Sequence, residues 1–247
     1  MIDVDSGGWR KRFRAFYFPR RHTALLVAIV VFISVRPLIG DAQVATTLFS
    51  IALVALLIVA LYTIQVEELV GERYRLTAER RRRIVVGWSL AGVAVVERVF
   101  TIFRPVHALH LTATVCYLLF FGFVAWQELR AVMRQRTITA EAISMSISVY
   151  LLIGITFGLL YVVMYERHPQ AFSLPGSTQQ LDDQTVIPTL IYFSLTTLST
   201  IGFGDITPVL MQARYAAVAE GITGQFYMAI LVARLVGLYM GQSKSGD

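Results

Sequence analysis

Long apolar runs recur along this chain, and they constrain its fold more than any other feature. The 247 residues are 56% hydrophobic and only 15% charged, whereas about a quarter of the residues in a soluble domain are charged. Several runs approach the roughly 20 residues that a helix needs to cross a bilayer. A helix satisfies its own backbone polar groups in lipid. The expected fold class is therefore an all-α membrane protein.

Six transmembrane helices are predicted, with a shorter apolar segment between the last two. The expected spans are 23–39, 43–64, 84–104, 107–127, 143–165 and 209–240. The segment 186–199 is too short to cross a membrane and too apolar for a surface loop. We expect it to be re-entrant, which is tolerated where protein or water surrounds the backbone.

The distribution of basic residues predicts the orientation of these helices. The net charge is +6, which could suggest a nucleic-acid partner. However, most of the 22 lysines and arginines gather in alternate connections, in the stretches 10–21, 73–83 and 130–136 and at the C-terminal end. This asymmetry predicts that both termini are cytoplasmic. It argues for contact with membrane lipid and against nucleic acid.

The runs and charges divide the chain into five parts. A basic cytoplasmic segment over 1–22 precedes a four-helix domain, a linker, a pore domain and a short tail, which are expected over 23–129, 130–142, 143–240 and 241–247. The one cysteine, Cys116, lies within the fourth span, so no intrachain disulfide is possible.

A glycine-rich motif follows the short apolar segment. It reads Thr-Ile-Gly-Phe-Gly-Asp over 200–205. Glycine accepts positive φ angles that other residues resist, so such a segment can turn successive carbonyls toward one axis. Four segments around an axis form rings of oxygens that replace the water shell of a cation. The preceding residues, 185–198, are expected to form a helix that Thr185 caps.

This motif resembles the selectivity filter of pore-loop potassium channels, whose signature is Thr-x-Gly-Tyr/Phe-Gly-Asp. The resemblance implies that K⁺, the permeant ion, is coordinated by the carbonyls of the first four motif residues and by the threonine hydroxyl. It also implies that the glycines supply backbone freedom and that the aspartate braces the outer mouth. The residues in these roles are Thr200, Ile201, Gly202, Phe203, Gly204 and Asp205. A pore of this family is lined by four filter segments. Because this chain contains one such motif, the resemblance implies a homotetramer.

Phe203 departs from the commonest form of the signature. Most family members have tyrosine at this place, and its hydroxyl can form a hydrogen bond behind the filter. The family also often has an acidic residue in the pore helix, where this chain has Thr196 and Thr197. We therefore expect packing of Tyr192, Phe193 and Phe203, more than hydrogen bonds, to brace the filter. A filter that is less stable at low potassium would follow.

The last span is expected to line the inner pore. Residues at three- and four-residue steps can share one face; they are Gly221, Gln225, Met228, Val232, Val236 and Tyr239. Gly221 and Gly224 can act as a hinge or allow close helix packing, and both interpretations remain open. Glu220 is unusual at mid-membrane depth. It is a candidate proton-sensitive element, or a hydrogen-bonded brace between helices.

The first four spans lack the features of a voltage sensor. A sensor needs several arginines or lysines at three-residue spacing. The fourth span contains none, although His107 and His110 lie at one end of it. We expect weak voltage dependence. Arg36 and Glu97 lie at similar predicted depth and are a candidate structural ion pair, with Arg98 and Arg104 as competing partners for Glu97.

A passive, homotetrameric potassium channel of the cell membrane is the function that these observations favour. A non-selective cation channel and a non-conducting regulatory membrane protein are the alternatives. The spans hold no arrangement of catalytic residues and no metal-ligand cluster. We therefore expect no enzymatic activity, no organic substrate and no cofactor other than permeant K⁺.

Overall fold

Helices form most of the described chain in the computed structural model. Described are residues 20–39, 42–70, 85, 87–89, 92, 107–174, 181 and 185–243. The helices are α2 (Arg21–Leu38), α3 (Ala42–Val70), α5 (His107–Arg134), α6 (Ala140–Arg167), α7 (Val186–Leu198) and α8 (Met211–Ser243). A 3₁₀ turn, η2 (Pro169–Ala171), and two short strands, β1 (Phe172–Ser173) and β2 (Thr207–Pro208), join α6 and α8 to the α7 region.

Four of these helices are long and apolar enough to cross a membrane, namely α2, α5, α6 and α8. They coincide with the predicted spans over 23–39, 107–127, 143–165 and 209–240. Helix α3 covers the predicted second span, although its apolar stretch, Thr47–Thr63, is shorter. The predicted third span, over 84–104, lies almost wholly outside the described residues. So does most of the predicted basic segment over 1–22, of which residues 20–22 are described.

The linker between the two halves is shorter than the predicted 130–142. Helix α5 continues to Arg134, and α6 already begins at Ala140. The Thr139 hydroxyl caps α6 by accepting a hydrogen bond from the backbone N–H of Ala142, at 3.1 Å. Glu141 in the first turn of α6 further suits the helix dipole. The last helix likewise extends past the predicted end at residue 240, to Ser243.

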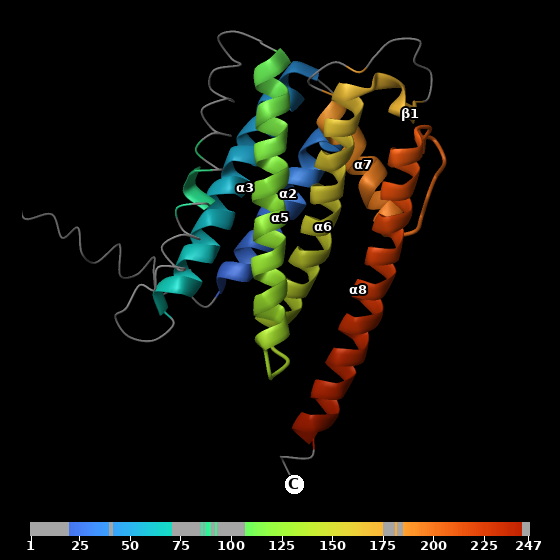
Figure 1. Ribbon diagram of the computed structural model, residues 1–247. Coiled ribbons are helices and arrows are strands. Elements are labelled where there is room, and N and C mark those ends of the chain that lie inside the picture. The colour runs from blue at the N-terminus through green and yellow to red at the C-terminus, as the bar shows by residue number, and fades with distance from the viewer. Residues whose placement is uncertain are drawn as a thin grey trace, which may run out of the picture.

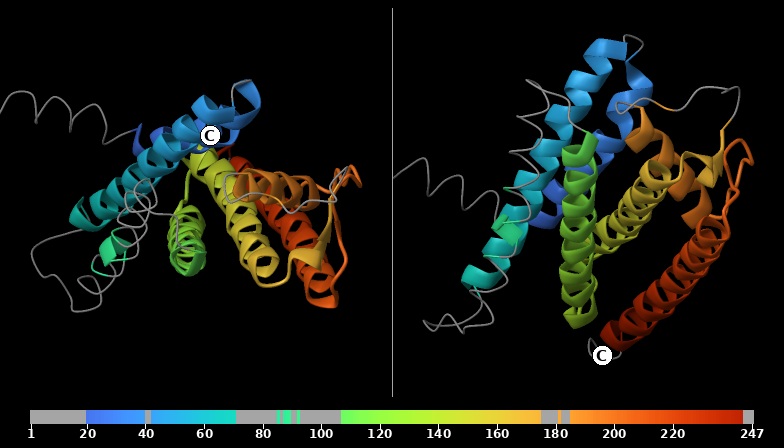
Figure 2. Two further views of the ribbon diagram at one scale, coloured as in Figure 1. Left: turned by 90° about the horizontal axis from the view of Figure 1, so that it is seen from above. Right: turned by 45° about the horizontal axis from the view of Figure 1, so that its top comes forward.

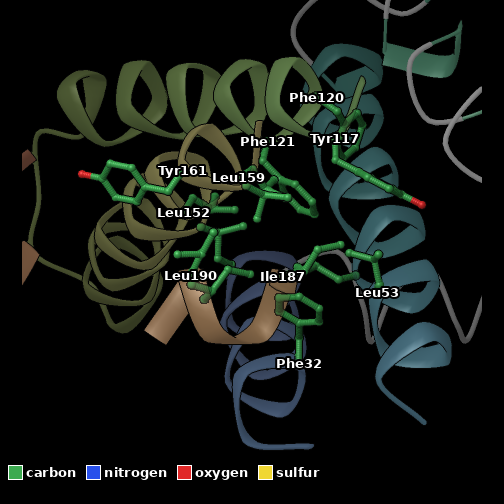
Figure 3. Packing of buried hydrophobic residues seen from close by; sticks show 14 of the residues in the cluster. Phe32, Leu53, Tyr117, Phe120, Phe121, Leu152, Leu159, Tyr161, Ile187 and Leu190 are labelled. Carbon is green, nitrogen blue, oxygen red and sulfur yellow. The ribbon is translucent and has the colours of Figure 1, made fainter. Parts of the chain in front are cut away.

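Helix α6 is central to the packing. It contacts α5 and α2 on one side and α7 and α8 on the other, and α8 lies at the edge of the molecule, on the side away from α3 (Figures 1 and 2). One apolar core runs from α2 and α3 through α5 and α6 to α7. Figure 3 shows Phe32, Leu53 and Phe121 in the same cluster as Ile187 and Leu190 of α7.

Two glycines of α6 allow α7 to approach closely. A Cβ atom at Gly158 would lie 2.8 Å from the Cα of Ile191, and one at Gly154 would lie 2.7 Å from the Leu195 side chain. Their four-residue spacing places both on one face of α6. Small residues at this spacing are typical of close helix packing in membranes. The short helix that precedes the glycine motif is therefore seated directly against α6.

We expect Gly158→Ala to lower stability, because the new methyl group would meet the backbone of α7 rather than a movable side chain. The effect should be about 1–3 kcal/mol, as in other overpacked cores. Gly122→Ala is the matched control, since a Cβ there would meet only Thr156, at an ordinary 3.6 Å. Thermal unfolding of the purified protein in detergent measures both. Equal melting temperatures for the two variants would contradict the close approach.

Candidate pore and selectivity filter

The loop after α7 has an alternating backbone. Thr200, Gly202 and Gly204 have φ angles of +59°, +53° and +79°, in the left-handed region that favours glycine. The prediction of positive φ at the two glycines is confirmed. The positive φ of Thr200 was not predicted, because a threonine gives no sequence signal for this conformation. Alternate left-handed residues turn successive carbonyl groups toward the same side of the loop.

The C-terminal end of α7 holds this loop in place. The carbonyl of Thr196 accepts hydrogen bonds from the N–H groups of Ile201, at 2.9 Å, and Gly202, at 3.2 Å. The N–H of Thr200 donates to the carbonyl of Thr197, at 3.0 Å. At the other end of α7, Thr185 occupies the N-cap position, but its side chain makes no capping hydrogen bond. Its backbone is already helical, whereas a capping residue is usually extended.

Tyr192 of α7 supports the outer part of the loop in two ways. Its hydroxyl donates to the carboxylate of Asp205, at 2.9 Å, and its ring stacks on Phe203 with an interplanar angle of 4° and a centroid distance of 6.4 Å. The hydrogen bond to Asp205 raises the pKa of the Tyr192 hydroxyl above its ordinary value. A tyrosine hydroxyl is protonated at neutral pH even without such a shift, so Tyr192 is a donor there.

The expected packing of Tyr192 against Phe203 is present, but packing is not the only support of the loop. Tyr192 supplies a hydrogen bond that the sequence analysis missed. Phe193 faces the other way, into an aromatic cluster with Tyr161 and Phe172, at centroid distances of 5.1 and 5.4 Å. Phe172 in turn belongs to β1, which pairs with β2 just after the loop, so that Phe172 lies opposite Pro208. The cluster therefore connects α7 to α6 and to the strand pair that follows the loop.

We expect Tyr192→Phe to weaken the loop without unfolding the chain, because the ring stack remains while the bond to Asp205 is lost. The change removes one hydrogen bond to a charged group and leaves the rest of the loop's contacts in place. In current recordings at low external potassium, the variant should lose its current faster than the original protein. Tyr62→Phe, an exposed tyrosine on α3, is the control. Identical decay of the current in the three proteins would contradict a bracing role.

The upper part of α8 contacts the start of the loop and the end of α7. The side-chain amide of Gln225 donates to the Thr200 hydroxyl, at 3.3 Å. A Cβ atom at Gly224 would overlap the carbonyl oxygen of Leu198. This contact favours the close-packing interpretation of Gly224 over a hinge. Gly221 is half-buried, and Met228 and Val232 are exposed on this chain, at 45% and 53%.

Glu220 joins three helices in the interior. It is fully buried, and its carboxyl group accepts hydrogen bonds from Tyr161 of α6, at 2.6 Å, and from Ser194 of α7. The Ser194 hydroxyl also lies 2.5 Å from the carbonyl oxygen of Gly154. Glu220 therefore links α8 to both α6 and the short helix α7. These bonds match the brace interpretation, and Tyr161 and Ser194 are partners that no local pattern indicated.

A cavity of about 890 Å³ lies behind the loop. Side chains of α2, α6 and α7 line it together with Ile201 and Asp205. Arg36, in the last turn of α2, is among the lining residues. Its predicted partner, Glu97, lies outside the described residues. Since Arg36 and Asp205 line the same cavity, the C-terminal end of α2 and the outer end of the loop are at the same side of the molecule.

These elements form an ion channel domain: a long helix, a short apolar helix, a glycine loop and a second long helix. Residues 149–240 match a family model described as an ion channel. The chain is 33% identical over 72 residues to the potassium channel protein kcv of Paramecium bursaria Chlorella virus 1. That match covers 29% of this chain and 77% of the viral protein. The chain therefore belongs to the pore-loop potassium channel family, and the match points to a channel rather than an enzyme.

Two bacterial relatives are also similar to part of the chain, and smaller shares of their own lengths are covered. Protein LctB of Bacillus caldotenax is 28% identical over 87 residues, which are 35% of this chain and 64% of that protein. Protein LctB of Geobacillus stearothermophilus is 29% identical over 80 residues, 32% of this chain and 59% of that protein. The chain thus spans less than two thirds of either LctB protein. No solved structure shows a significant match.

Proposed function

We propose that this protein is a homotetrameric, potassium-selective channel of the cell membrane, with six transmembrane helices, a re-entrant α7 and both termini in the cytoplasm. The observation that carries the proposal is the alternation of left-handed residues at 200, 202 and 204, in a loop hydrogen-bonded to the end of α7. The basic connections of the chain support the orientation. Weak voltage dependence is expected, because α5 carries no lysine or arginine before Arg130.

In the proposed filter, backbone oxygens take the place of water around K⁺. The carbonyls of Thr200, Ile201, Gly202 and Phe203 and the Thr200 hydroxyl are the ligands that the family pattern assigns. Hydrogen bonds to Thr196 and Tyr192 hold the loop in this conformation. A ring of such oxygens selects ions by its size or by the field of its dipoles.

A single chain leaves this site incomplete, and its exposed surface supports assembly. Ile201 and Phe203 are 59% and 68% exposed. Helix α8 also presents a row of exposed apolar side chains, at Tyr215, Val218, Ile222, Phe226 and Ile230. Such a row must face lipid or other copies of the chain, since a large apolar patch in water is unfavourable. Four copies around one axis complete the rings and cover part of α8.

Rubidium uptake by vesicles that contain the purified protein tests conduction, and the mass of the detergent-solubilised assembly tests its stoichiometry. The proposal predicts a tetramer and uptake that stops when the potassium gradient is removed. A monomer or dimer would contradict the proposed ring. A stable tetramer without uptake would favour the non-conducting regulatory protein.

A further inference from the structure

A buried polar cluster lies where the start of α2 meets α5 and α6, at the end of the molecule away from the filter loop. His22 and Glu128 are its centre, with side chains only 5% and 1% exposed. The His22 Nδ1 atom lies 3.0 Å from the Glu128 carboxylate. Burying two such groups is unfavourable unless they are paired, and neither belongs to the proposed ion pathway.

The hydrogen bonds define the protonation state of the His22 ring. Arg21 donates from Nε to Nε2 of His22, at 2.9 Å, so that Nε2 carries no proton in this arrangement. The ring proton is then on Nδ1 and is donated to Glu128. A second proton could be taken up only at Nε2. It would displace the Arg21 guanidinium and turn the bond with Glu128 into an ion pair.

Other charged groups lie near His22 along the chain and on α6. Glu141 of α6 accepts hydrogen bonds from the His22 backbone N–H, at 3.2 Å, and from the Thr23 hydroxyl, at 2.9 Å. Arg20 lies just before α2, beside Arg21. On α3, the acidic residues of the last turns are Glu67 and Glu68, whose side chains are outside the described part. Histidine is the side chain that most readily changes charge between pH 5 and 8.

The same end of α5 is also tied to the inner helix. Arg234 of α8 donates to the backbone carbonyls of Val132 and Gln135, the latter at 2.5 Å. Its guanidinium also lies 3.7 Å from the sulfur of Met133. Glu128 and Val132 are one helical turn apart on α5. The segment 128–135, at the end of α5, is therefore bound to α2 through His22 and to α8 through Arg234.

We propose that His22 is a proton switch for the pore, which acts through the end of α5 and Arg234 on the inner helix α8. This inference rests on the proposed channel function and orientation. Proton uptake strengthens the link between α2 and Glu128, because the donor to the buried Glu128 carboxylate changes from a neutral ring to a cation. The end of α5 is then held more firmly and restrains the cytoplasmic half of α8. Acidification of the cytoplasmic side therefore closes the pore.

His22→Gln is the variant that isolates the switch. Glutamine can donate to Glu128 and accept from Arg21, as the neutral ring does, but it does not titrate. His168→Gln is the matched control, because His168 is exposed at the opposite end of α6. Arg234→Lys keeps the charge but loses the fork that reaches two carbonyls. Rubidium uptake by vesicles, with equal pH on both sides, is measured at pH 7.5 and 5.5.

Uptake by the original protein and by His168→Gln should be about fivefold lower at pH 5.5 than at pH 7.5. This factor is at the lower end of the usual coupling between two sites. Uptake by His22→Gln and by Arg234→Lys should not change with pH. An unaltered pH response in His22→Gln would overturn the switch. An unaltered response in Arg234→Lys would overturn the route through α8.

A second measurement separates this inference from the proposed function. Spin labels at Thr137→Cys and Met240→Cys, in a Cys116→Ala background diluted with unlabelled chain, report the distance between the α5–α6 linker and the end of α8. If no rubidium enters at any pH, the proposed conduction fails. The switch is then supported by a pH-dependent distance that His22→Gln abolishes, and overturned by a distance that does not change.

Discussion

Replacement of Gly202 by alanine should reduce rubidium uptake by about a hundredfold or more. The φ angle of Gly202 is +53°, and nothing lies within 4 Å of a Cβ atom built there. The effect is therefore one of backbone conformation and not of a steric clash. A non-glycine residue in the left-handed region costs about 1–2 kcal/mol, and the proposed tetramer contains four such alanines. Their combined cost would shift the filter toward another conformation, in which its carbonyls no longer face one axis.

The control for this variant is again Gly122→Ala, which lies on α5 and meets only an ordinary contact. Both variants should be purified as assemblies of the same mass, since Gly202 contributes nothing to the packed core. Full uptake by Gly202→Ala would show that ions do not pass through a filter in the conformation described here.

Glu220→Leu is the second variant with a large expected effect. Leucine leaves the buried Tyr161 hydroxyl without its acceptor, and an unsatisfied buried group costs about 1–3 kcal/mol per chain. Glu220→Gln should be nearly neutral, because its amide can accept from Tyr161 and donate to Ser194. Melting of the purified assembly in detergent compares the two variants. A Glu220→Gln variant that is as unstable as Glu220→Leu would mean that the charge, and not the hydrogen bonds, holds the three helices.

A double variant sharpens this comparison. Tyr161→Phe removes the hydroxyl that Glu220→Leu leaves unsatisfied, so that the combination should be more stable than the sum of the two single effects. Residues in contact usually show interaction energies of about 0.5–3 kcal/mol in such cycles. If the changes in stability of the two single variants simply add up in the double variant, a direct bond between Tyr161 and Glu220 is not the source of stability. An unchanged pH response of uptake in Glu220→Gln would separately dispose of a proton-sensing role for this residue.

The parts of this structure that the sequence predicted are those with a local signal. The apolar runs predicted α2, α5, α6 and α8, and the Gly-Phe-Gly pattern predicted the positive φ of Gly202 and Gly204. Helix ends were less predictable, because hydropathy does not reveal where a polar helical turn continues. For this reason the linker before α6 was predicted too long, although Thr139 could have been recognised as a cap.

The contacts between distant segments could not be predicted in the same way. Glu220 was recognised as unusual, but its partners Tyr161 and Ser194 are 59 and 26 residues away. The buried partner of His22 is 106 residues away. Such pairs depend on how α6 brings α2, α5 and α7 together. The four-residue spacing of Gly154 and Gly158 is the one local signal of that packing.

The reversal potential of single-channel current tests the central claim most directly. Purified protein in a planar bilayer is recorded with potassium on one side and sodium on the other, at equal concentration. Rings of backbone oxygens that replace the water around K⁺ predict a reversal potential displaced far toward the potassium equilibrium potential. A reversal potential near zero would contradict the account and indicate a non-selective cation channel.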